Sequence, residues 1–138
     1  MMNTVYFYLL SPLHTGGTTQ EGNLVGIARE SHTTLPYVPS STIRGRLRAT
    51  VKSQNQTQCF QLFGTELDQA QQLEQGDIWV GDGSLLWVPV PSLSHGVVWI
   101  SSPFLLRRWQ SRQPPKQEKT AIPQPYSCNF NQKSKVYL

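Results

Sequence analysis

Short apolar runs alternate with polar or proline-containing breaks along the chain, which predicts several short strands and few helices. Val5 to Leu10 is an aromatic and aliphatic run closed by Ser11-Pro12, and it predicts a buried strand. Residues 13–19 form a polar, turn-rich stretch that predicts a loop. We expect a short extended segment over residues 23–29 and an irregular, proline-containing connection over residues 31–41.

The strongest periodicity belongs to a helix that we expect to begin at a cap on Ser40 or Ser41 and to end near Ser53. Three apolar residues recur at a spacing of four and can pack on a sheet: Ile43, Leu47 and Val51. A cation follows each of them by one residue, about 100° further round the helix axis: Arg44, Arg48 and Lys52. The pattern therefore predicts an apolar face beside a row of three cations.

The second half of the chain is richer in strand-forming residues. After a polar break at 54–58, the expected elements are an apolar turn over 59–63 ending at Gly64, a Gln-rich, weakly helical stretch over 67–74, strand composition over 77–90, a turn at His95-Gly96, a strand over 97–101 and a short helix over 103–109. Residues 110–134 predict a Gln/Pro/Lys-rich linker or disordered insertion, and residues 135–138 the start of a further strand. This order predicts an α+β fold with an antiparallel sheet.

Charge is unevenly distributed along the 138 residues, a length that fits one ordinary domain. The formal net charge of +4 divides into +3 for residues 1–60, −5 for residues 61–98 and +6 for residues 99–138. Two basic blocks flanking an acidic one indicate that one face of the protein binds a polyanion. Alternatively, the blocks interleave in the fold and cancel.

The cysteines and the apolar runs bear on the compartment. Cys59 and Cys128 are far apart and have no metal-ligand spacing, so free thiols in a reducing compartment fit better than a disulfide. The first ten residues lack a basic leader and a small-residue cleavage site, so we expect no signal peptide. No apolar run approaches the ~20 residues that a membrane span needs. We therefore expect a cytoplasmic protein without a membrane partner.

The start of the predicted helix has the chemistry of a phosphate site. Pro39-Ser40-Ser41 places hydroxyls and unpaired amide N–H groups at the positive end of the helix dipole. Arg44 adds a guanidinium group that can hold phosphate through two hydrogen bonds. Gly45 costs the helix ~1 kcal/mol relative to Ala, which fits a close approach to the backbone. A solvated amphipathic helix with an ordinary cap explains the same residues, and the helix alone does not decide between the two.

Ordered motifs on both sides of this helix resemble a known family. They are Leu13-His14-Thr15-Gly16-Gly17, Ala28-Arg29-Glu30, Leu35 to Gly45, Leu62-Phe63-Gly64, Gly76-Asp77-Ile78 with Asp82 and Leu85, Val88 to Leu93, Trp99 to Pro103, and Leu106-Arg107-Arg108. In this order they resemble the repeat-associated mysterious protein (RAMP) superfamily of CRISPR effectors. The similarity is greatest to the repeating backbone subunit of type III complexes, especially in the Cmr branch.

The resemblance implies a ferredoxin-like or RNA-recognition-type RAMP core with inserted hairpins over residues 1–109, incomplete in this chain. Such subunits stack along CRISPR RNA and display it to target RNA, beside other RAMP subunits and the large subunit of the effector complex. The implied guide-backbone contacts are His14, Ser40, Ser41, Arg44 and Arg48, and the helix pattern adds Lys52. The family's backbone subunits are considerably longer, so we expect either a truncated or split gene, or a second chain or later segment that completes the sheet.

The resemblance also concerns catalysis. Backbone subunits of this type commonly cut target RNA with an aspartate a few residues before the Arg-Glu pair, and Asn23 stands at that position here. An amide lacks the charge and basicity for the role, although Glu21 is a possible substitute. We therefore expect RNA binding without cleavage, no cofactor, and a divalent metal only if cleavage occurs.

Two other functions stay open at this point. One is an endoribonuclease that cuts target RNA within the same complex. The other is a scaffold that contacts only protein, with four tryptophans as interface anchors: Trp79, Trp87, Trp99 and Trp109. Packing in a core or on strands is the ordinary role of such tryptophans.

Overall fold

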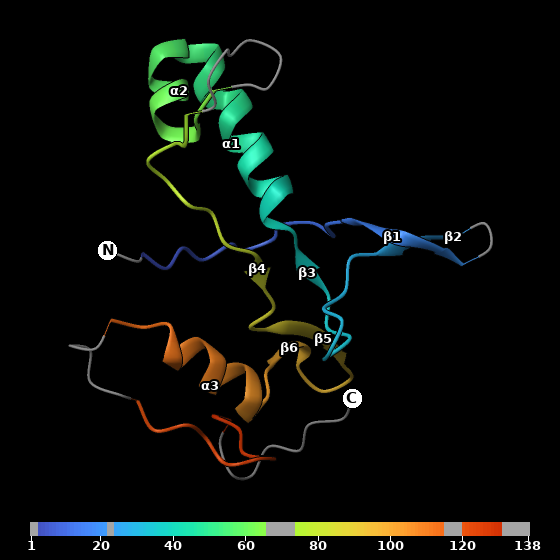
Figure 1. Ribbon diagram of the computed structural model, residues 1–138. Coiled ribbons are helices and arrows are strands. Elements are labelled where there is room, and N and C mark those ends of the chain that lie inside the picture. The colour runs from blue at the N-terminus through green and yellow to red at the C-terminus, as the bar shows by residue number, and fades with distance from the viewer. Residues whose placement is uncertain (1–2, 22–23, 66–73, 115–119, 131–138) are drawn as a thin grey trace. The chain divides into compact units, whose positions relative to one another are not determined.

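The computed structural model describes residues 3–21, 24–65, 74–114 and 120–130 (Figure 1). Helices and antiparallel strands both occur, so the predicted α+β class is confirmed. The chain forms two compact units, one of residues 9–84 and the other of residues 1–8 with 85–138. No helix among the described residues has the length and apolar character needed to cross a membrane.

In the unit of residues 9–84, four short strands form two separate antiparallel pairs. Strands β1 (Gly16–Glu21) and β2 (Leu24–Ile27) form a hairpin, and β3 (Tyr37–Val38) pairs with β4 (Gly83–Ser84) (Figure 1). Ala28 links the two pairs, since its N–H donates to the Thr15 carbonyl (2.9 Å) and its carbonyl accepts from the Tyr37 N–H (3.2 Å). The link places β3, and the helix that follows it, beside the base of the hairpin.

Two helices, α1 (Ser40–Gln54) and α2 (Gln56–Phe63), complete this unit and pack against each other (Figure 1). Asn55 separates them and caps α2, because its side chain accepts a hydrogen bond from the Gln58 N–H. Cys59 is fully buried and Phe63 is 3% exposed, so α2 supplies the apolar core of the helix pair. The polar break and apolar turn predicted for residues 54–63 form this second helix instead.

Two glycines bring the chain leaving α2 back against it. Gly64 has a φ of +78°, and a Cβ there would collide with the Glu74 carbonyl oxygen. A Cβ at Gly76 would collide with the Leu62 carbonyl oxygen and the Gly64 nitrogen. The backbone therefore approaches itself too closely for a side chain at either position, and residues 75–79 lie against the end of α2.

The unit of residues 1–8 and 85–138 is built on a hairpin and a helix. Strands β5 (Val88–Ser92) and β6 (Gly96–Ile100) pair in register, and α3 (Pro103–Ser111) follows them. The predicted turn at His95-Gly96, the strand after it and the proline-initiated helix are confirmed. Val98 and Leu105 are this unit's buried apolar residues among those described.

The predicted buried strand at residues 5–10 is wrong. No strand forms there, and the six side chains are 53–90% exposed. A strand needs a neighbour that supplies backbone hydrogen bonds, and this segment has none with the other described residues. Side-chain contacts reach it instead: the Tyr6 hydroxyl accepts a hydrogen bond from Trp109 Nε1 (2.7 Å), and the Tyr8 ring lies 5.6 Å from that of Trp99.

Two further element predictions differ from the structure, and two others fall largely or wholly outside the described residues. The loop predicted for residues 13–19 contains the start of β1, because the Thr-rich stretch pairs with β2. Residues 77–82 have strand composition but form no strand, and the N–H groups of Asp77 and Ile78 donate to carbonyls at the end of α2 instead. Most of the stretch 67–74 and the predicted strand start at 135–138 lie outside the described residues.

The exposed apolar segment at residues 5–10 leads to a solubility prediction. We expect the isolated chain to self-associate, because an unpaired apolar segment of strand composition invites pairing between chains. Leu10→Lys should shift the population toward monomer. Leu93→Lys is the matched control, because Leu93 is equally exposed but lies in the β5–β6 turn. Size-exclusion chromatography with light scattering measures both, and a monodisperse wild-type monomer would contradict the prediction.

Candidate nucleic-acid interface

The first turn of α1 is capped from a distant part of the chain. The expected side-chain cap on Ser40 or Ser41 is wrong: the N-cap residue is Pro39, and no side chain at the cap bonds the helix. Instead, the Asp82 carboxylate, which adjoins β4, accepts a hydrogen bond from the Ser40 N–H (2.6 Å). A negative charge is favourable at this end of a helix because the helix dipole is positive there. The Ser41 N–H has no partner among the described residues.

Arg44 and Arg48 close the far end of α2. Both donate to the Phe63 carbonyl, and Arg48 also donates to the Gly64 carbonyl (2.9 Å). The last carbonyls of a helix lack partners within it, so cationic donors satisfy them well. The Arg44 guanidinium also lies 5.9 Å from the centre of the Phe63 ring.

These contacts change the predicted faces of α1. Arg48 is half-buried while Leu47 is 45% exposed, and no residue of α1 is fully buried. The helix therefore directs Arg48, one cation of the row, toward the Phe63 and Gly64 carbonyls at the end of α2. Arg44 stays exposed, and only one of its N–H groups donates to a described residue.

The remaining predicted RNA contacts lie at different distances from this helix start. His14 is exposed and adjoins Thr15, whose hydroxyl donates to the Tyr37 carbonyl three residues before α1 (3.2 Å). Lys52 lies in the last turn of α1, roughly 18 Å along the axis from Ser40. The fold thus brings the base of the β1–β2 hairpin toward the start of α1 and leaves Lys52 at the other end.

Two residues are considered for catalysis, Glu21 and Asn23. Glu21 ends β1, and Asn23 lies outside the described residues. Where the structure is described, no three His, Cys, Asp or Glu side chains gather as a metal site would require. Whether this chain cuts RNA therefore stays a prediction.

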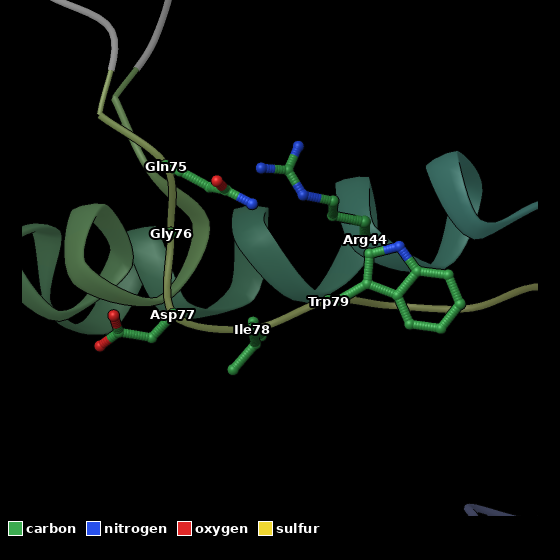
Figure 2. A pocket seen from close by; sticks show the side chains of 6 residues that line it. All are labelled: Arg44, Gln75, Gly76, Asp77, Ile78 and Trp79. Atoms are coloured by element: carbon green, nitrogen blue, oxygen red, sulfur yellow. The ribbon is translucent and has the colours of Figure 1, made fainter. Parts of the chain in front are cut away.

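A hollow of about 280 Å³ lies beside Arg44. Its other lining residues come from the segment that returns against α2: Gln75, Gly76, Asp77, Ile78 and Trp79. Figure 2 shows the Gln75 amide and the Arg44 guanidinium pointing toward each other, while the side chains of Asp77 and Ile78 point away. Sequence reasoning missed Gln75 and Asp82 as neighbours of α1, because no local pattern indicates contacts over such separations.

Comparison with known proteins identifies the family. The family model described as the RAMP superfamily matches residues 6–136, which is nearly the whole chain. The chain belongs to the RAMP superfamily. The predicted family is therefore confirmed, and the match includes α1 and the hollow.

Similarity to individual RAMP proteins supports the Cmr branch. The CRISPR system Cmr endoribonuclease Cmr4 of Pyrococcus furiosus is 32% identical over 110 residues, which cover 77% of this chain and 37% of that protein. The crystal structure of oligomeric Cmr4 from Pyrococcus furiosus matches 70% of this chain and 37% of its own, with a TM-score of 0.58 and 28% identity. A second crystal structure of Cmr4 matches 62% of this chain and 32% of its own, with a TM-score of 0.53 and 29% identity. The chain spans about a third of the length of these relatives.

Proposed function

We propose that this RAMP chain is a CRISPR-RNA-binding backbone subunit of a type III ribonucleoprotein, which presents guide RNA to target RNA. The observation that carries the proposal is the homology to Cmr4, a protein of the CRISPR system Cmr. Its expected partners are CRISPR RNA, target RNA, other RAMP subunits and the large subunit, in the cytoplasm. The protein contributes no sequence readout of its own, because base pairing between the two RNAs supplies it.

The contacts around α1 support a narrower RNA-binding set than the sequence did. Ser41 offers an amide N–H at the positive end of the helix dipole, and Arg44 offers exposed guanidinium donors one turn later. An arriving phosphate meets the Asp82 carboxylate already bonded to Ser40, so Arg44 is the principal cation of this site. Arg48 contributes by holding α2, while His14 and Lys52 remain proposed contacts to neighbouring nucleotides.

Salt dependence of RNA binding tests this function against a protein-only scaffold. The assembled complex, reconstituted with labelled CRISPR RNA, should lose affinity steeply as salt rises, because cations that neutralise phosphates release counterions. Fluorescence anisotropy at several salt concentrations gives the slope. A complex that assembles without RNA and binds it no better than a complex lacking this chain would contradict the proposal.

Endoribonuclease activity is the second candidate, favoured by the description of the Pyrococcus relative as an endoribonuclease. We propose that this chain does not cut, because Asn23 replaces the expected aspartate. Asn23→Asp should then create target cleavage in the assembled complex, at the position of this subunit, if the site is otherwise intact. Gel mapping of labelled target RNA measures it, with Asn23→Ala as the matched control. Cleavage of target RNA by the wild-type complex that Glu21→Ala abolishes would contradict the proposal that this chain does not cut.

A further inference from the structure

Trp79 differs from the other tryptophans in its surroundings. Its side chain is 85% exposed, whereas Trp87 and Trp99 are each 46% exposed. Trp99 also lies beside the Tyr8 ring, and Trp109 donates to the Tyr6 hydroxyl. Trp79 has no hydrogen bond or ring partner among the described residues. The ring is therefore accessible to a ligand.

The backbone that carries Trp79 is nevertheless held in place. The Asp77 N–H donates to the Gln61 carbonyl (3.0 Å), and the Ile78 N–H donates to the Leu62 carbonyl (3.1 Å). The indole itself lies over Gly81, where an added Cβ would stand 3.0 Å from two ring carbons. The backbone next to the ring is therefore held in place before any ligand arrives, while the indole stays exposed.

Arg44 and Trp79 line the same hollow (Figure 2). Arg44 supplies a cation whose remaining N–H groups have no partner among the described residues. The hollow measures about 280 Å³, just below the ~300–1,000 Å³ of sites that enclose a drug-sized ligand. It therefore has room for one small ligand group, and Arg44 favours an anionic one.

We propose that Trp79 and Arg44 together bind one nucleotide of the single-stranded RNA held by this subunit. The base stacks on the indole of Trp79, and its phosphate contacts the guanidinium of Arg44. This inference rests on the proposed function and adds a base contact to the same site. Every base has a π-face, so stacking on Trp79 holds RNA without reading its sequence, as a guide-binding subunit requires.

The chemistry of the hollow favours a nucleotide over a protein segment. A protein anchor would bury Trp79 among apolar side chains, whereas the hollow that Trp79 lines also has the Arg44 guanidinium and the Gln75 amide in its wall. Those two groups offer hydrogen-bond donors to phosphate and base edges. Asp77 is the carboxylate nearest along the chain, and its side chain points away from Arg44 in Figure 2.

Substitution of Trp79 in the assembled complex, combined with an abasic probe, tests the inference. Trp79→Ala should weaken binding of labelled CRISPR RNA about tenfold without changing the salt slope, because stacking is not electrostatic. Trp79→Phe should retain most of the affinity, and Trp87→Ala is the control. RNA with an abasic nucleotide at the contacted position should bind the wild-type complex about tenfold more weakly than normal RNA does. The Trp79→Ala complex should bind the abasic and the normal RNA with equal affinity.

Each outcome of this test decides the inference. Stacking is supported if Trp79→Ala and the abasic RNA each lower the binding affinity by the same factor and the two changes together lower it no further. Unchanged affinity in Trp79→Ala overturns the base contact while leaving the proposed function intact. Loss of complex assembly in the absence of RNA overturns it in favour of a protein anchor. Failure of the wild-type complex to bind RNA overturns both the base contact and the proposed function.

Discussion

Replacing Arg44 by glutamate in the assembled complex should weaken the binding of CRISPR RNA by about tenfold to hundredfold, the equivalent of one lost charge-assisted hydrogen bond plus added repulsion. Arg44 is exposed near the start of α1, and a single one of its N–H groups donates a hydrogen bond to the Phe63 carbonyl among the described residues. The slope of log affinity against log salt should also fall by about 0.7, the contribution of one phosphate on a single strand.

The matched control for Arg44 is Arg46→Glu. Arg46 is exposed on the same helix, and its substitution changes the net charge by the same amount. A general electrostatic field would make the two variants equally weak, whereas a specific contact makes Arg44 several-fold more important. Equal losses of affinity would remove Arg44 from the site.

Replacing Arg48 by alanine should cost the α1–α2 pair about 3 kcal/mol. The substitution removes two donors from the end of α2 and leaves the carbonyl of buried Gly64 without Arg48. A buried acceptor that loses a charged donor carries its full desolvation cost, because water does not replace the donor there. Hydrogen exchange of α2 amides in the assembled complex should accelerate about 100-fold.

Arg46→Ala is the control for this stability effect. Its side chain is exposed on α1, so we expect a change within about 0.5 kcal/mol. Arg48→Lys should recover only part of the loss, because an ammonium group does not reproduce the two-pronged geometry of guanidinium. Unchanged exchange in Arg48→Ala would show that α2 does not depend on this cap.

The sequence predicted those elements whose signals are local. Helix α1 ends one residue from the predicted Ser53, because its periodicity and flanking prolines lie within the helix or next to it. The same holds for the turn at Gly96, where φ is +69°. The strand predicted at residues 5–10 failed because composition shows that a segment favours pairing and does not show whether a partner is present.

The candidate site was predictable only in part, for a related reason. The motifs gave the family and directed attention to α1, and the family is confirmed. The roles of its cations depend on contacts across the fold, since Arg48 bonds a carbonyl 16 residues away and Ser40 bonds Asp82, 42 residues away. No periodicity along α1 distinguishes an arginine that holds a helix end from one that meets a phosphate.

Photo-crosslinking tests the central claim most directly. The complex is assembled with guide RNA that carries 4-thiouridine at successive positions, irradiated and digested, and the crosslinked peptides are mapped by mass spectrometry. The proposed function predicts crosslinks from this chain in the peptides that contain the start of α1 or Trp79, recurring at regular positions of the guide. Crosslinks confined to other subunits, with none in this chain at any position of the guide, would contradict the claim.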